Sequence, residues 1–174
     1  MNIFVLHRDA LVAASHMCDK HVVKMILESA QMLSTVHHLY DNPYNLPLYK
    51  KCFVNHPCTL WVADSSQNYN WLAEHAYALC NIYRNRYGKT HKSTDLIFKM
   101  VFQYPELPNR GLTNFAQAMP DKYKVFGDPV LAYRKYYVGE KSRFAKWTCN
   151  PEPEWYTTML KENEYERSED FATN

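Results

Sequence analysis

The chain has 174 residues, 47% hydrophobic and 22% charged, a composition typical of a single globular domain with a core of its own. Its 4 glycines form no Gly-x-Gly or Gly-Lys-Ser/Thr pattern, so a glycine-rich phosphate-binding loop is excluded. The net charge is only +2. No apolar run is long enough to span a membrane and the first residues do not resemble a signal peptide, so we expect a cytoplasmic protein without a membrane partner.

The first elements are an apolar arm and two helices. Residues 1–6 are apolar and predict a short strand or a buried arm. Asp9 can cap a short helix over about residues 10–17. A long helix is predicted over about 19–40, where an Asp-Asn-Pro sequence ends it.

The long helix over 19–40 carries a narrow polar stripe on an otherwise apolar surface. At 100° per residue, seven polar side chains fall within roughly one quarter-turn: Lys20, His21, Lys24, Glu28, Gln31, Thr35 and His38. A helix that is apolar around most of its circumference is buried, and buried ionisable groups are paired or line a cavity. The stripe therefore predicts an active-site wall, unless Lys24 and Glu28 merely pair with each other.

The rest of the chain also shows helical spacing. Further helices are predicted over about 58–87, 94–103 and 129–147, separated by a Pro- and Tyr-rich connection at 42–57 and a long loop at 104–128. Gly88 suits a helix C-terminus, and Asp128 suits a cap before a proline. The predicted fold class is mostly α, a single compact domain with two long helices, several shorter helices and an irregular acidic C-terminal tail.

Charge is divided unevenly between the body and the tail. Residues 149–174 hold seven acidic and two basic residues, a net charge of −5, so residues 1–148 carry +7. We expect one helical catalytic or nucleic-acid-binding domain over 1–148 and an acidic tail over 149–174. A basic body suits double-stranded DNA or a nucleotide as partner, although a solvated tail on an ordinary enzyme gives the same charges.

The cysteines predict no disulfide framework and no metal site. Their number is 5 and no Cys-x-x-Cys spacing occurs, which indicates reduced thiols. Cys52, His56 and Cys58 have poor spacing for zinc and lack a fourth ligand. We therefore expect no metal and no cofactor, and His56 either caps the next helix or contacts a phosphate.

Residues 133–147 interleave five cations with five aromatic residues. Cations bind phosphates and aromatic faces stack on exposed bases, so the segment predicts a nucleic-acid or nucleotide surface. An amphipathic helix with Tyr and Trp inward and Lys and Arg outward is the alternative. The candidate binding residues of this segment are Arg134, Lys135, Tyr137, Lys141, Arg143 and Lys146.

Three blocks of residues follow one another along the chain. The first is the apolar arm followed by Asp19-Lys20-His21 and then Glu28. The second is Pro57-x-Thr59 at the start of a long helix that ends with a basic residue and glycine. The third is the aromatic and basic segment over 133–141. In this order the three blocks resemble the phage-type pyrimidine-dimer DNA glycosylases, the dimer-excising endonuclease V family, and the resemblance extends over residues 1–147.

This resemblance implies a DNA glycosylase/AP lyase acting on a damaged or modified pyrimidine. Such an enzyme flips the base out, forms a Schiff base between its N-terminal α-amine and C1′, and breaks the backbone by β-elimination. By position the amine is that of Met1, the catalytic carboxylate is Glu28, and His21 positions the substrate or contacts a phosphate. An α-amine suits this role because its pKa of ~7.7–8.0 leaves a sizeable neutral fraction.

The chain departs from the family pattern at the residues around the glutamate. The family has arginines where this chain has Leu27 and Gln31, and Lys20 and Lys24 supply positive charge one turn earlier. Lys24 is therefore a second candidate nucleophile, while Lys20 and Gln31 are candidates for binding the substrate.

The N-terminus departs from the pattern too, and it leaves other functions open. In the family the amine belongs to a threonine exposed by removal of the initiator methionine, whereas here the second residue is Asn2, another substrate-binding candidate, which is too large for ordinary removal of Met1. The same Lys/His/Glu pocket would also suit an enzyme acting on a nucleotide or modified nucleobase, or the chain is a non-catalytic DNA-binding phage protein.

Overall fold

The computed structural model describes residues 1–172, and within that range it is helical, without strands. The elements are α1 (Ala10–Ser15), α2 (Asp19–Leu39), α3 (Pro57–Asp64), α4 (Ser66–Tyr87), α5 (Thr94–Phe102), the short 3-10 helix η1 (Asp121–Tyr123), α6 (Pro129–Lys141) and α7 (Glu154–Ala172). The predicted mostly α fold class is confirmed. Within residues 1–172, no helix combines the length and the apolar character needed to cross a membrane.

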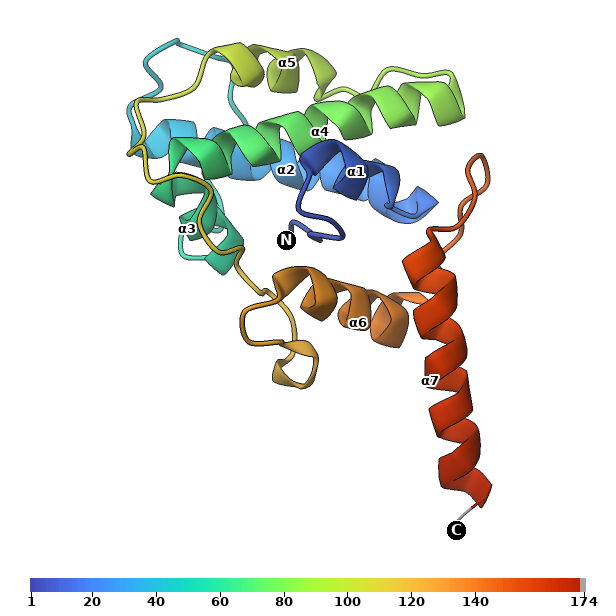
Figure 1. The fold of residues 1–174 in the computed structure, drawn as a ribbon. Helices are drawn as coiled ribbons and strands as arrows, with labels where there is room; N and C mark the ends of the chain where they lie inside the picture. The colour runs from blue at the N-terminus through green and yellow to red at the C-terminus, as the bar shows by residue number, and fades with distance from the viewer. Residues whose placement is uncertain (173–174) are drawn as a thin grey trace.

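Two long helices form the main layer of the molecule. α2 packs against α4, with α1 and α5 against α4 and α3 against both long helices. Figure 1 shows α6 lying apart from this layer, with the N-terminus of the chain between them. Residues 1–6, for which the sequence predicted either a short strand or a buried arm, form a buried arm. Ile3, Val5 and Leu6 are fully enclosed and belong to the core.

Several helix ends lie where their capping residues predict. The Asp9 side chain accepts hydrogen bonds from two backbone N–H groups at the start of α1. The Asp128 side chain accepts from Leu131 N at the start of α6, where Pro129 occupies the first turn. Gly88 ends α4 with φ 62°, a left-handed conformation that glycine adopts without steric cost.

Two of the predicted helices have different bounds. The helix expected over 58–87 is broken at Ser65, which is extended (φ −151°, ψ 145°). Its hydroxyl accepts from Gln67 N and donates to the carbonyl of Gly111 at 2.7 Å, so the break is fixed by a segment distant in sequence. The helix expected to reach 147 ends at Lys141.

The acidic tail is not irregular as expected, because Glu154–Ala172 form α7. Its first turn is anchored: Tyr156 is buried and its ring lies 4.7 Å from that of Trp147. The indole N–H of Trp155 donates to Nδ1 of His16 at 3.1 Å. From this anchor α7 runs away from the body of the molecule (Figure 1).

A buried ion pair joins the start of α2 to the end of α4. Arg86 has a side chain only 2% exposed, and its Nη1 lies 2.8 Å from Oδ1 of Asp19. The other carboxylate oxygen of Asp19 accepts from the backbone N–H and the hydroxyl of Thr148, in the segment after α6. Asp19 thus connects three parts of the chain, which keeps the beginning of α2 in place beside the N-terminal arm.

We predict that Arg86→Met lowers the free energy of unfolding by about 3 kcal/mol, because removing one partner leaves a buried charge uncompensated. Urea denaturation measures the change. The matched control is Arg110→Met, which removes an exposed pair with Asp64 of similar length, 2.7 Å. It should cost less than about 1 kcal/mol. Equal losses in the two variants would contradict a structural role for the buried pair.

Candidate active site

A cavity of about 340 Å³ lies where the N-terminal arm, α2 and the end of α6 meet. Its lining combines cations, aromatic rings and one carboxylate: Met1, Asn2, Phe4, Lys20, His21, Lys24, Glu28, Tyr136, Lys141, Arg143 and Phe144. The predicted stripe on α2 therefore reaches a cavity through its first four members, and the chain's first residue lies in the same cavity.

The carboxylate of Glu28 interacts with three nitrogen atoms of this cavity. Its Oε2 accepts a hydrogen bond from the backbone N–H of Asn2 at 3.1 Å and lies 3.7 Å from the α-amino nitrogen of Met1. Its Oε1 lies 3.3 Å from Nζ of Lys24. The side chain of Glu28 is 14% exposed, whereas that of Lys24 is 67% exposed. Glu28 thus pairs with Lys24 as the simple alternative predicted, and it also holds the chain's first two nitrogens.

The arm that carries the amine is held at several points. The Met1 side chain is only 2% exposed, with its sulfur 3.9 Å from the hydroxyl of Thr59. The Asn2 side chain accepts from the backbone N–H groups of Ile3 and Phe4 and donates to the carbonyl of Ala118 at 2.8 Å. These bonds support the left-handed backbone of Phe4 (φ 39°), a conformation that costs free energy for a bulky residue.

His21 forms the buried side of the cavity as a neutral ring. Its Nδ1 lies 2.8 Å from the hydroxyl of Tyr137, and the ring of Phe4 stacks on it at 4.4 Å. Burial lowers the pKa of His21 to about 3, and the nearby cations Lys141 and Lys24 add to the shift. A hydroxyl proton donated to Nδ1 would leave the ring proton on Nε2, so His21 would offer a hydrogen-bond donor without charge.

Parts of the predicted stripe lie elsewhere. Gln31 follows Glu28 by three residues on α2 but does not line the cavity. The Thr35 hydroxyl donates to the carbonyl of Cys52, and Nε2 of His38 bonds the carbonyl of Tyr49. The helix is also less enclosed than predicted, because Val23 is 42% exposed. The stripe therefore lines the cavity only through its first four members.

Of the predicted binding residues in the aromatic and basic segment, only Lys141 and Arg143 line the cavity with Glu28. Tyr137 is fully buried, its hydroxyl bonds His21, and it does not line this cavity. Lys135 lines a separate pocket with Tyr123, and Lys146 is exposed but lines no described pocket. The segment has some side chains pointing into the core and others pointing to solvent, which agrees with the alternative prediction of an amphipathic helix.

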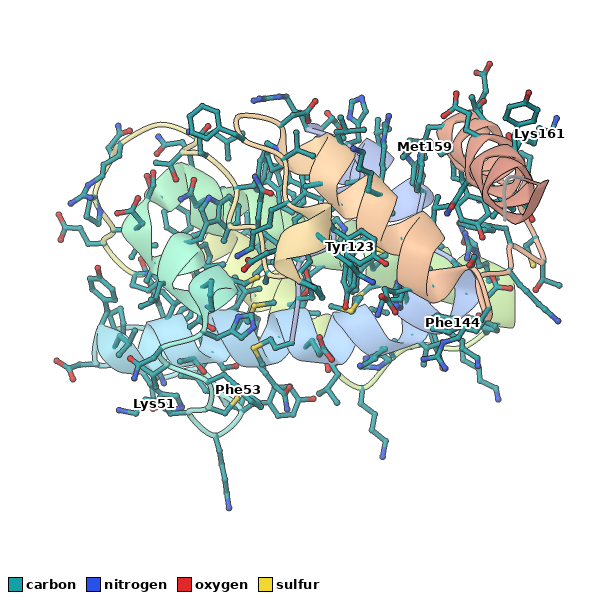
Figure 2. All side chains as sticks on the ribbon, turned by 90° about the horizontal axis from the view of Figure 1, so that it is seen from below. Lys51, Phe53, Tyr123, Phe144, Met159 and Lys161 are labelled. Atoms are coloured by element: carbon teal, nitrogen blue, oxygen red, sulfur yellow. The ribbon has the colours of Figure 1, made fainter. Side chains whose placement is uncertain are left out.

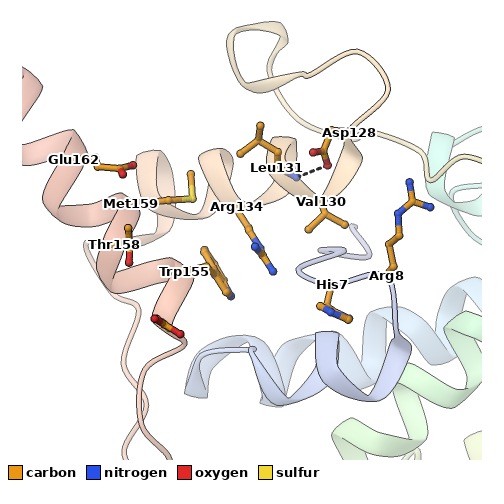
Figure 3. A pocket seen from close by; sticks show the side chains of 11 residues that line it. His7, Arg8, Asp128, Val130, Leu131, Arg134, Trp155, Thr158, Met159 and Glu162 are labelled. Carbon is orange, nitrogen blue, oxygen red and sulfur yellow. Dashed lines mark hydrogen bonds between the residues drawn. The ribbon is translucent and has the colours of Figure 1, made fainter.

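Arg134 lies in a larger pocket of about 760 Å³ between α6, α7 and the residues before α1. Its Nε donates to the carbonyl of Leu6, and its guanidinium lies 5.0 Å from the ring of Trp155. Figure 3 shows Arg134 and Trp155 side by side in this pocket, with His7 and Arg8 across from them. Three carboxylates also line it, which makes it a poor site for an anion.

His56 performs the structural role that the sequence allowed. Its Nδ1 accepts from Cys58 N and caps α3. The pKa of His56 is lowered by burial and by the positive α-amine, while Glu28 acts in the opposite direction, so the ring lies within electrostatic reach of the cavity. Among the described residues, no three potential ligands from His, Cys, Asp and Glu gather as a metal site would need.

Sequence reasoning missed three aromatic side chains that line the cavity: Phe4, Tyr136 and Phe144. Two of them belong to the aromatic and basic segment, where no periodicity distinguished cavity-facing rings from core rings. Thr59, which contacts Met1, was part of a recognised motif without an assigned role. In Figure 2, Phe144 lies near the end of α6.

Comparison with known proteins gives one match. A sequence model of the family described as pyrimidine dimer DNA glycosylase matches residues 1–95, more than half of the chain. No curated protein and no solved structure shows a significant match. The matched segment contains the arm, α2 and Glu28, whereas the cavity residues contributed by α6 and the turn after it lie beyond it.

We predict that His21 makes folding stability depend on pH. Its pKa is about 6.5 in the unfolded chain and about 3 in the folded protein, so the unfolded state binds the proton first and stability falls as pH drops below about 6.5. Urea unfolding at pH 7, 6, 5 and 4 should give a shallower decline for His21→Gln, by at most about 1.4 kcal/mol per pH unit. Above pH 7.5 the difference between the two proteins should stay constant. Parallel curves down to pH 4 would contradict the shift.

Proposed function

The chain belongs to the pyrimidine dimer DNA glycosylase family, and from that premise we propose that it is a DNA glycosylase with AP lyase activity that removes a damaged or modified pyrimidine from double-stranded DNA. The observation that carries the proposal is the α-amino nitrogen of Met1 lying 3.7 Å from the Glu28 carboxylate in a cavity. An amine and a carboxylate at this distance are the two groups that Schiff-base chemistry at C1′ requires.

In the proposed reaction the neutral amine attacks C1′ while the glycosidic bond breaks and the base departs with the bonding electrons. The amine nitrogen loses a proton, the sugar ring opens, and a protonated imine remains between the chain and C1′. Removal of a proton from C2′ then expels the 3′ phosphate by β-elimination, and water releases the enzyme. Glu28 is suited to carry these protons, because it lies beside the amine and is largely screened from solvent.

Two amines approach Glu28, and the geometry favours the α-amine as nucleophile. The Met1 side chain is enclosed and holds its amine in place, whereas the Lys24 side chain is 67% exposed. An α-amine has a reference pKa of ~7.7–8.0 against ~10.4 for lysine, so more of it is neutral near pH 7. Lys24 is then the group that balances the charge of Glu28 and approaches a phosphate.

The cavity supports DNA as the substrate despite the low net charge of the chain. Four cationic side chains line it, Lys20 and Lys24 from α2 and Lys141 and Arg143 from the other side, against the single carboxylate of Glu28. Cations on both sides of one cavity can hold phosphates that flank an everted nucleotide. His21 is neutral and buried, and it adds a hydrogen-bond donor on the buried side of the cavity.

We predict that sodium borohydride traps the protein on duplex DNA containing an abasic site, with the adduct on the first residue. Intact mass must first establish that the chain begins with an unblocked Met1. Lys24→Met should still be trapped, whereas a variant with a short N-terminal extension, which moves the amine out of the cavity, should not. Glu28→Gln should lower turnover at least 100-fold, on the order of the effect of removing a general acid–base.

Peptide mapping of the adduct decides between the two amines. An adduct on Lys24 would overturn the assignment to Met1 and keep the Schiff base. The absence of an adduct with the unmodified protein would overturn the Schiff base itself, and stabilisation by a mononucleotide without duplex binding would then favour an enzyme acting on nucleotides.

We also predict that Arg143→Gln weakens duplex binding. The plot of log association constant against log salt concentration should become less steep, its negative slope shrinking by about one, because one phosphate contact is lost. The matched control is Lys135→Gln on the same segment, whose side chain lines another pocket. Fluorescence anisotropy at several salt concentrations measures both slopes. A larger change for Lys135→Gln would show that DNA lies against the other pocket.

A further inference from the structure

Two of the three aromatic rings that line the Glu28 cavity are already occupied. Phe4 is 6% exposed, with the ring of His21 stacked at 4.4 Å and that of Tyr136 nearly parallel at 6.0 Å. Tyr136 has Phe4 on one side, the amine of Lys141 4.4 Å from its ring centre, and a hydrogen bond from that amine to its hydroxyl. Neither ring offers a face that a ligand could cover without breaking these contacts.

Phe144 is in a different situation. It lies in the turn that follows α6, where its backbone N–H donates to the carbonyl of Lys141 at 3.0 Å, and its side chain is half-buried. The ring of His21 meets it at 73°, close to perpendicular, at 5.6 Å. The contacts over its ring are cations, Lys20 at 5.1 Å and Arg143 at 5.7 Å.

These cations are groups that a nucleic acid would attract away. Lys20 and Arg143 are both exposed, long and flexible, and a cation over an exposed ring is held weakly. A phosphate offers either of them a stronger, charge-assisted partner. When the cations move to phosphates, the face of Phe144 becomes free toward a cavity whose size is typical of small-molecule sites.

We infer that Phe144 forms a stacking subsite for the nucleobase that enters the Glu28 cavity, and that Lys20 and Arg143 exchange the ring for the flanking phosphates. The inference rests on the proposed function. A ring suits this task because every base presents a π face, so stacking holds the base without reading its identity. Phe144 lies outside residues 1–95, so this subsite belongs to the part of the chain beyond the family match.

The test separates base from backbone by comparing two duplexes in a turnover-deficient Glu28→Gln background. One duplex contains a pyrimidine dimer and the other a tetrahydrofuran abasic analogue, which has no base to stack. Phe144→Leu should weaken binding of the dimer duplex about ten-fold or more and binding of the analogue less than about two-fold. Phe144→Trp, which keeps an aromatic face, should restore binding of the dimer duplex.

The control is Phe102→Leu, because Phe102 is 68% exposed on α5, away from the cavity. It should leave both affinities unchanged. Equal losses on the two duplexes with Phe144→Leu, or no loss on either, would overturn the stacking subsite. Failure of the proposed chemistry would appear separately, as the absence of a borohydride adduct with the unmodified protein, and it would leave this comparison of affinities valid.

Discussion

The structure around the cavity depends on one carboxylate. Glu28 is largely screened from water, and a screened charge needs compensation by nearby donors and cations. It accepts a hydrogen bond from the N–H of Asn2 and pairs with the amines of Met1 and Lys24. A residue of α2 therefore positions the α-amine of the chain. The energy that holds the arm comes from elsewhere, since Ile3, Val5 and Leu6 are completely or almost completely removed from solvent.

The arm combines apolar anchoring with local strain. Phe4 has a left-handed backbone conformation, and the Asn2 side chain stabilises that turn by accepting hydrogen bonds from two backbone N–H groups. The Asn2 amide also donates to the carbonyl of Ala118, which links the arm to the long loop over 104–128. Asn2, predicted from the sequence as a substrate contact, lines the cavity, and its side chain also bonds the arm and the loop.

The sequence predicted what depends on local spacing and could not predict what depends on distant partners. The bounds of α2 and the caps at Asp9, Gly88 and Asp128 follow from residues within one helical turn. The break at Ser65 depends on a bond to Gly111, 46 residues away, and no local signal distinguishes it from another polar residue in a helix.

The same limit applies to the site. The stripe on α2 predicted a cavity near Glu28, because polar residues on an apolar helix need a partner. The sequence could not predict which rings of the segment over 133–147 face that cavity. Tyr136 and Tyr137 are neighbours in sequence, yet only Tyr136 lines it. The direction of each ring is set by how α6 is placed against α2, which is a property of the whole fold.

The low net charge of the chain is consistent with a strongly cationic site because charge is segregated. Lys20 and Lys24 face Lys141 and Arg143 across a small cavity, and such like charges repel one another where water is partly excluded. After burial, Lys141 and Lys24 are the causes of the lowered pKa of His21. Glu28 offsets only part of this repulsion, and the phosphates of the proposed DNA substrate would offset more of it. Seven of the 18 acidic residues of the chain lie in the last 26 residues, so residues 1–148 carry a net charge of +7.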